Sequence, residues 1–199
     1  YMSGIIAWNY FSNCLTETSG TFTNNADLFG KVYFPRIIIP LSKIMSGLSR
    51  FFIQLVMFLG FYYYYLRFEN VNIKPTLSML FYLPLFIFLL ATLGLGMGML
   101  ISSLTTKYRD LRYLVSFGTQ LMMYASPIIY PLSMIPNEYR FLIIANPITP
   151  IIVGFRQAFI SAGVIDLNML INSVILTIVI FLIGLLVFNR VEKHFIDTV

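Results

Sequence analysis

Hydrophobic residues gather into long runs along this chain. Three runs, at residues 47–66, 77–104 and 169–188, are almost free of charge. An α-helix needs roughly 20 apolar residues to cross the hydrocarbon core of a membrane, and each run has about that length. Residues 113–130 form a fourth apolar run, which contains Gln120 and ends in Ser126-Pro127. The four runs predict membrane-spanning helices, because the strands of a β-barrel would alternate polar and apolar residues.

Residues 1–27 predict a fifth span that is unusually polar. Four polar residues recur there at helical spacing: Asn9, Asn13, Glu17 and Asn24. A helix facing lipid would not tolerate this density of polar side chains. Two interpretations remain open. The polar face lines a hydrated path or contacts a polar substrate, or it holds the helix to its neighbours by hydrogen bonds.

Composition supports a membrane protein and excludes several other classes. Of the 199 residues, 58% are hydrophobic and only 11% are charged, whereas a soluble domain has about 25% charged residues. The single cysteine, Cys14, and the single histidine, His194, exclude a disulfide scaffold and a Cys/His metal cluster. No catalytic constellation or phosphate-binding glycine loop is found. Gly94 and Gly98, four residues apart in a span, predict close packing against another helix.

Basic residues predict the orientation in the membrane. Nine of the 13 Lys and Arg residues fall on one side of the membrane, outside the predicted spans or, for Arg50, at the start of one: Lys31, Arg36, Lys43, Arg50, Lys107, Arg109, Arg112, Arg190 and Lys193. The side richer in Lys and Arg is the cytoplasmic one. The tail, residues 189–199, is therefore expected in the cytoplasm. The net charge of +5 is explained by topology, so no nucleic-acid partner is expected.

Two connecting segments are unusual. Residues 131–166 lie outside the membrane by this topology, yet they are too apolar for an open loop, and prolines interrupt any continuous helix. Short helices that dip into the outer half of the membrane and return would satisfy both facts. On the cytoplasmic side, residues 28–46 and the charged turn at residues 105–112 are either plain connectors or docking elements for a soluble partner.

Several motifs, in this order, resemble one family: IAWNYFSN (6–13), KVYFPRIIIP (31–40), YRDLRY (108–113), SPIIYP (126–131), NP (146–147), GFR (154–156) and RVEK (190–193). The sequence is similar to permease subunits of ABC-2 type exporters for polysaccharides, of the O-antigen kind, with capsule and wall teichoic acid exporters as relatives. The similarity covers nearly the whole chain. Such permeases have six spans preceded by an interfacial helix. About five spans are expected here, without the interfacial helix and the first span.

The resemblance implies a role for each segment. It implies an all-α, polytopic permease in the inner membrane of a bacterium, paired with a second copy around a channel and with separate ABC ATPase subunits. The substrate would be a polyprenyl-diphosphate-linked glycan, and the partner ATPase, not this chain, would bind ATP and Mg. Candidate channel-lining residues are Trp8, Asn9, Asn13, Glu17 and Tyr130. Candidate ATPase-coupling residues are Lys31, Tyr33, Phe34, Arg36, Tyr108, Arg109 and Asp110, and candidates for an external gate are Pro127, Pro131, Tyr139 and Arg140.

Two other classes share this composition. A membrane-embedded enzyme acting on lipid-linked sugars should show acidic residues and Arg clustered at one interface, and here such residues are few and scattered. An ion-coupled carrier of small solutes usually shows internal repeats with helices broken at the midplane. The sequence contains no such repeat, so the exporter subunit is the favoured interpretation.

Overall fold

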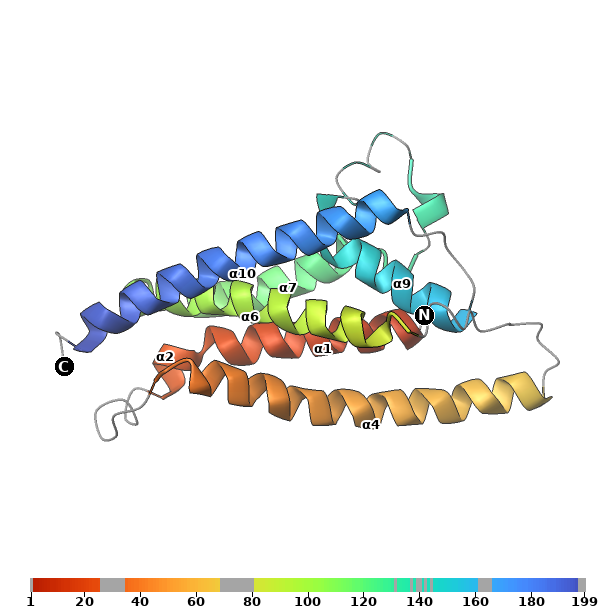
Figure 1. The fold of residues 1–199 in the computed structure, drawn as a ribbon, viewed down its shortest axis with the longest axis horizontal. Helices are drawn as coiled ribbons and strands as arrows, with labels where there is room; N and C mark the ends of the chain where they lie inside the picture. The colour runs from red at the N-terminus through yellow and green to blue at the C-terminus, as the bar shows by residue number, and fades with distance from the viewer. Residues whose placement is uncertain are drawn as a thin grey trace.

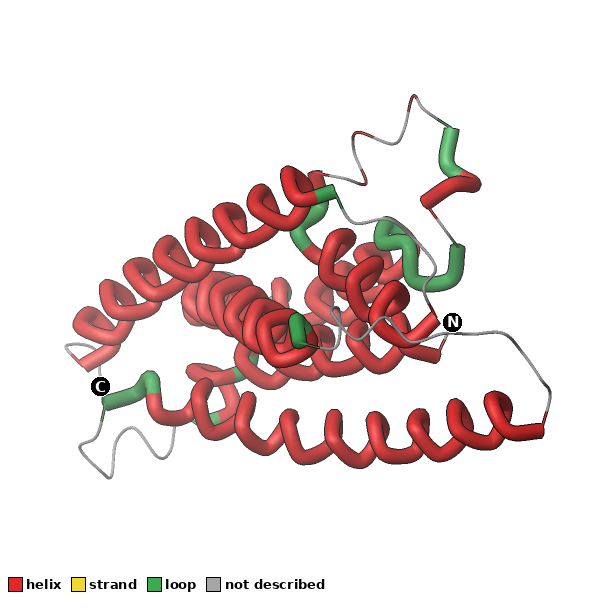
Figure 2. Tube along the Cα trace, turned by 45° about the vertical axis from the view of Figure 1, so that its right-hand side comes forward, coloured by secondary structure: helices red, strands yellow, loops and turns green. Residues whose placement is uncertain are grey.

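The computed structural model describes residues 2–25, 35–68, 81–130, 132–136, 138, 141, 143, 145–160 and 166–196. Within these ranges every regular element is a helix and no strand occurs (Figures 1 and 2), which confirms the expected all-α fold. The helices are α1 (Met2–Ser19), α2 (Thr21–Asn24), α4 (Ile38–Phe68), α6 (Leu83–Lys107), α7 (Leu111–Tyr124), the 3-10 helix η1 (Leu132–Met134), α9 (Ile148–Ile160) and α10 (Leu167–Ile196).

Three helices, α4, α6 and α10, are long and apolar enough to cross a membrane. They overlap the predicted spans 47–66, 77–104 and 169–188, although α6 begins only at Leu83. Helix α4 begins at Ile38 rather than at residue 47, so the predicted cytoplasmic segment 28–46 is helical in its second half. Pro40 does not prevent this, because it lies in the first helical turn, where backbone N–H groups have no partner within the helix.

Helices α1 and α7 are shorter than the spans predicted for them. Helix α1 ends at Ser19, and the separate helix α2 follows Gly20. Helix α7 has 14 residues and ends at Tyr124 rather than at residue 130, because Pro127 disfavours the helical conformation of the residue before it. At 1.5 Å per residue, α7 is only about 21 Å long. The following residues, 125–130, form turns.

Helix α6 lies at the centre of the bundle, with α1 on one side and α10 on the other (Figure 1). Glycines allow both contacts to be close. A Cβ atom added at Gly94 would lie 2.7 Å from Cβ of Cys14 on α1, and one added at Gly98 would lie 2.5 Å from Cβ of Thr18. On the opposite face, a Cβ at Gly96 would lie 2.7 Å from Cα of Phe181 on α10. The predicted close packing at Gly94 and Gly98 is therefore confirmed.

The two ends of the bundle differ in chemistry. The first residues of α4 and α7 and the last residues of α6 and α10 lie at the same end of the molecule (Figure 1). This basic end carries Arg36, Lys43, Lys107, Arg109, Arg112 and Arg190. At the opposite end, which we call the proline end, residues 126–130 and the start of α9 meet. Helix α9, with 13 residues, is too short to cross a membrane and packs against α1, α6 and α10.

Candidate functional site

A polar groove of about 380 Å³ lies between α1 and α4. Buried Tyr10, Gly47 and Phe51 form the less polar part of its lining. Its other members carry amide, hydroxyl or guanidinium groups: Asn9, Ser12, Asn13, Thr16, Arg50 and Gln54. The groove thus brings two of the predicted channel-lining residues, Asn9 and Asn13, together on one face of α1.

Most of these polar side chains have no protein partner. In the described part of the chain, Asn9, Ser12, Thr16 and Gln54 make no side-chain hydrogen bond. Away from water, an unpaired amide or hydroxyl costs free energy on the order of 1–3 kcal/mol. A groove with several such groups between α1 and the membrane-length helix α4 is therefore suited to water or to a hydroxyl-rich ligand.

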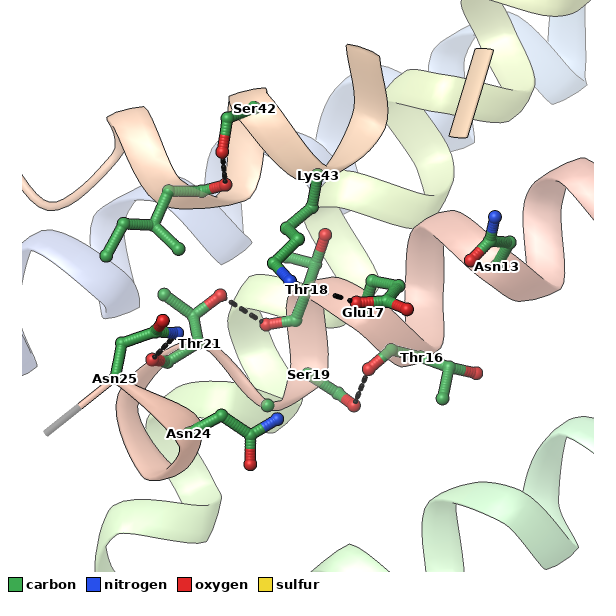
Figure 3. Close-up of polar contacts among 12 residues, drawn as sticks. Asn13, Thr16, Glu17, Thr18, Ser19, Thr21, Asn24, Asn25, Ser42 and Lys43 are labelled. Carbon is green, nitrogen blue, oxygen red and sulfur yellow. Dashed lines mark hydrogen bonds and ion pairs between the residues drawn. The ribbon is translucent and has the colours of Figure 1, made fainter. Parts of the chain in front are cut away.

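A charged cluster borders the groove toward the basic end. The carboxylate Oε2 of Glu17 on α1 lies 3.3 Å from Nζ of Lys43 on α4 (Figure 3). Its Oε1 lies 3.9 Å from Nη1 of Arg50, and the same nitrogen donates a 3.4 Å hydrogen bond to Oδ1 of Asn13. We call these four residues the Glu17 cluster. It joins α1 to two points on α4, Lys43 and Arg50, that lie about two helical turns apart.

Sequence reasoning missed the α4 side of this site. It assigned Lys43 and Arg50 only to the charge bias that sets topology. A signal was present, because Lys43, Gly47, Arg50 and Gln54 recur at helical spacing and so share one face of an otherwise apolar helix. That face is the one α4 turns toward α1.

The remaining channel-lining candidates lie elsewhere. Trp8 is 4% exposed and its ring packs against Phe11, so it does not share the exposed face of Asn9. Tyr130 lies at the proline end, where its hydroxyl donates a 2.9 Å hydrogen bond to the carbonyl of Tyr124.

Other polar groups of the N-terminal segment are satisfied locally. The hydroxyls of Ser19 and Thr21 each donate a 2.7 Å hydrogen bond to a carbonyl three residues earlier (Figure 3). Asn24 does not continue the stripe of Asn9, Asn13 and Glu17, because the chain breaks at Gly20. Its Oδ1 instead accepts a 2.8 Å hydrogen bond from Nη2 of Arg112. The polar residues of the N-terminal segment therefore have two roles. Some line the groove, and others make local hydrogen bonds that hold the segment to itself and to its neighbours.

The coupling candidates that the structure describes lie at the basic end. Arg36 is 6% exposed, and its backbone N–H and guanidinium donate hydrogen bonds to Oε1 and to the main-chain carbonyl of Glu192. It ties the start of α4 to the end of α10 rather than presenting a free charge. Tyr108, Arg109 and Asp110 are exposed in the turn between α6 and α7. The coupling candidates Lys31, Tyr33 and Phe34 lie outside the described residues.

Three motifs that are far apart in the sequence meet at the proline end. Arg156 on α9 donates hydrogen bonds to the carbonyls of Pro127, Ile128 and Tyr130, at 3.0, 2.8 and 3.4 Å. Nδ2 of Asn146 donates to the hydroxyl of Ser126 at 3.0 Å. Helix α9 thus holds the turn at residues 126–130, which includes the gate candidate Pro127. The other gate candidates, Pro131, Tyr139 and Arg140, lie outside the described residues.

Helix α7 presents a second exposed polar and aromatic face. Tyr113, Phe117 and Tyr124 are exposed by 79%, 58% and 65%, and exposed Gln120 lies between them at helical spacing. Tyrosine offers an apolar ring and a polar hydroxyl, so such a face suits both ring stacking and hydrogen bonding. Sequence reasoning predicted this helix but assigned none of these four residues to a site.

Comparison with known proteins agrees with this architecture. Residues 2–160 match the family described as ABC-2 type transporter. The chain is 29% identical over 196 residues to the O-antigen export system permease protein RfbA of Klebsiella pneumoniae, covering 98% of this chain and 73% of that protein. A protein of the same name from Myxococcus xanthus is 24% identical over 200 residues, covering 98% and 74%. The chain therefore belongs to the ABC-2 type transporter family of membrane proteins.

Proposed function

We propose that this chain is the permease subunit of an ATP-driven exporter that moves a lipid-linked polysaccharide of O-antigen type across the cytoplasmic membrane. The similarity to O-antigen export permeases over 98% of the chain carries the proposal. The chemistry of the groove supports it, because a polymer rich in hydroxyls needs weak hydrogen bonds at several points while it moves. The exposed aromatic face of α7 adds surfaces on which sugar rings stack.

Orientation and partners follow from the same proposal. The basic end faces the cytoplasm, because Lys and Arg are enriched in cytoplasmic segments, so the C-terminus of α10 is cytoplasmic. A separate ATPase binds ATP and Mg and docks at this end, next to the exposed Tyr108, Arg109 and Asp110 turn. Two copies of the permease pair around the transport path, and the substrate is a glycan on a polyprenyl diphosphate.

Affinity purification of the full-length protein from its own host tests the partner directly. We expect a soluble ATPase to co-purify in stoichiometric amount after extraction in mild detergent, because the transport energy must enter through a second chain. Mass spectrometry of the purified material identifies it. If the protein is isolated without an ATPase at every salt and nucleotide condition tried, the exporter proposal is wrong, and an autonomous carrier or an embedded enzyme becomes the better explanation.

Replacing Asn9 and Asn13 together by leucine should reduce export. Leucine removes the hydrogen-bonding groups and narrows the groove, and each lost hydrogen bond of about 1 kcal/mol slows passage several-fold. We expect surface polysaccharide, measured by immunoblotting, to fall by about tenfold at an unchanged protein level. The matched control is Asn168→Leu, at the exposed start of α10. Full export by the double variant would refute a transport role for the groove.

A further inference from the structure

Arg50 places a positive charge deep along a membrane-length helix. It lies 12 residues after Ile38, the first residue of α4, which is about 18 Å along the helix axis. The 31 residues of α4 extend for about 46 Å, whereas the hydrocarbon core of a membrane is about 30 Å thick. When α4 is centred in the membrane, the backbone of Arg50 therefore lies about 10 Å inside the hydrocarbon boundary.

The charge of Arg50 is only partly compensated by the protein. Among the described residues, Glu17 is the one carboxylate within 4.0 Å of Arg50, and Glu17 lies closer to Lys43, at 3.3 Å against 3.9 Å. Asn13, the other partner of Arg50, is neutral. The Glu17 cluster thus holds two cations and one anion.

Excess positive charge at this depth is unfavourable unless water or an anion accompanies it. The side chain of Arg50 is 64% exposed, and it opens into the groove where Asn9, Thr16 and Gln54 lack protein partners. A guanidinium presents its N–H groups in a planar fork that matches two oxygens of a phosphate. The depth of Arg50 along α4, the net positive charge of the Glu17 cluster and the exposed N–H groups of the guanidinium therefore favour binding of an oxyanion.

We propose that Arg50 binds a phosphate group in the groove between α1 and α4, and that Glu17 is the counter-ion which this phosphate displaces. Glu17 keeps its closer partner, Lys43, when Arg50 turns to the phosphate. The proposal rests on the proposed function where the phosphate belongs to the diphosphate of an exported lipid-linked glycan. The headgroup of a membrane phospholipid offers the same chemistry, and the experiment distinguishes the two sources.

The test measures binding of farnesyl diphosphate to the full-length protein, purified with its co-purifying ATPase and reconstituted in phosphatidylcholine nanodiscs. We expect Arg50→Gln to weaken binding by about tenfold or more, because a hydrogen bond between charged groups is lost. Glu17→Gln should instead tighten binding by up to about tenfold, because it removes the competing carboxylate. A merely structural ion bridge predicts no gain of affinity from Glu17→Gln, so the sign of this change is the decisive readout.

Matched variants and probes control for misfolding and for lipid partition. Arg67→Gln changes an exposed arginine at the other end of α4 and should leave the affinity unchanged. Farnesol, which lacks the diphosphate, should not bind in an Arg50-dependent way. In nanodiscs that contain phosphatidylglycerol, Arg50-dependent competition with farnesyl diphosphate would assign the site to phospholipid headgroups, whereas lack of competition would assign it to the diphosphate.

Two results would overturn the phosphate site. One is wild-type affinity in Arg50→Gln, and the other is unchanged or weaker binding in Glu17→Gln. Polysaccharide export by the wild-type protein, measured in parallel in cells, separates this failure from a failure of the proposed function. If wild-type cells export the polymer while Arg50→Gln binds normally, only the phosphate site is wrong. If the wild-type protein supports no export, the proposed function is wrong. Arg50-dependent competition by phosphatidylglycerol would then still show whether the site binds a phosphate group.

Discussion

Replacing Gly184 by alanine should prevent normal assembly of the helical bundle. A Cβ atom at Gly184 would overlap the main-chain carbonyl oxygen of Gly96, and it would lie 3.0 Å from the carbonyl carbon of that residue. The obstacle is backbone, so no side chain can rotate away, and α10 must move off α6 instead. Overpacking of this kind costs about 1–3 kcal/mol and more when backbones must separate. We expect the monodisperse yield after detergent extraction to fall sharply, as measured by size-exclusion chromatography.

The chain offers controls of the same chemistry for this substitution. Gly60 on α4 and Gly118 on α7 are also helical, and a Cβ added at either meets nothing within 4 Å. Alanine at these positions should be neutral or slightly stabilising, by about 0.5–1 kcal/mol, because glycine is a poor helix former. Gly96→Ala should be as damaging as Gly184→Ala, since its Cβ would lie 2.7 Å from Cα of Phe181. Normal yields from both Gly96→Ala and Gly184→Ala would show that α6 and α10 pack less closely than described.

Much of the fold follows from local patterns in the sequence. Runs of apolar residues locate α4, α6 and α10, because membrane crossing imposes a minimum length on an apolar helix. The spacing of Gly94 and Gly98 predicts the face that packs against α1, because residues four apart share a helix face. Helix ends were less predictable. Helix α4 extends back to Ile38 through charged Lys43, which a hydropathy pattern alone assigns to a connector.

The candidate site was only half predictable. Asn9, Asn13 and Glu17 could be recognised because polar residues at helical spacing are conspicuous in an apolar chain. Their partners on α4 depend on which helix α1 packs against, and that arrangement is set by contacts between distant segments. Arg36 shows the same limit, because its burial depends on Glu192, which lies 156 positions later in the sequence. Trp8 directly precedes Asn9 in the sequence, but each helical residue advances by about 100°, so Trp8 lies off the exposed face of Asn9.

At the proline end, side chains from distant segments bind backbone carbonyl groups, and the sequence pattern does not reveal these contacts. Residues 126–130 form turns, so their carbonyl groups have few partners of their own. Arg156 supplies donors to three of these carbonyls, and the hydroxyl of Ser173 on α10 donates to the carbonyl of Pro147. Prolines break the helix here, and side chains from α9 and α10 compensate for the lost backbone hydrogen bonds.

Replacing Arg156 by methionine should loosen the turn at residues 126–130 while leaving the rest of the bundle folded. Methionine has a similar length but no donor, so the carbonyls of Pro127, Ile128 and Tyr130 lose their partner. Hydrogen bonds to a charged group contribute about 1.5–3 kcal/mol each, and unpaired buried carbonyls add a penalty. Hydrogen–deuterium exchange should therefore rise in peptides covering residues 125–135, and under the proposed function polysaccharide export should fall with it.

Control peptides and control variants show whether the effect of Arg156→Met is confined to the turn at residues 126–130. Exchange in peptides from α6 and α10 should match the wild-type protein, because Arg156 donates its hydrogen bonds to the turn that follows α7. Arg156→Lys should restore only part of the protection, since an ammonium is a single point of charge and cannot reproduce the planar fork of a guanidinium. Arg67→Met removes an exposed arginine from the end of α4 and controls for the change in net charge. Unaltered exchange at residues 125–135 in Arg156→Met would mean that the turn is held by Pro127, Ser126 and Asn146 without the arginine.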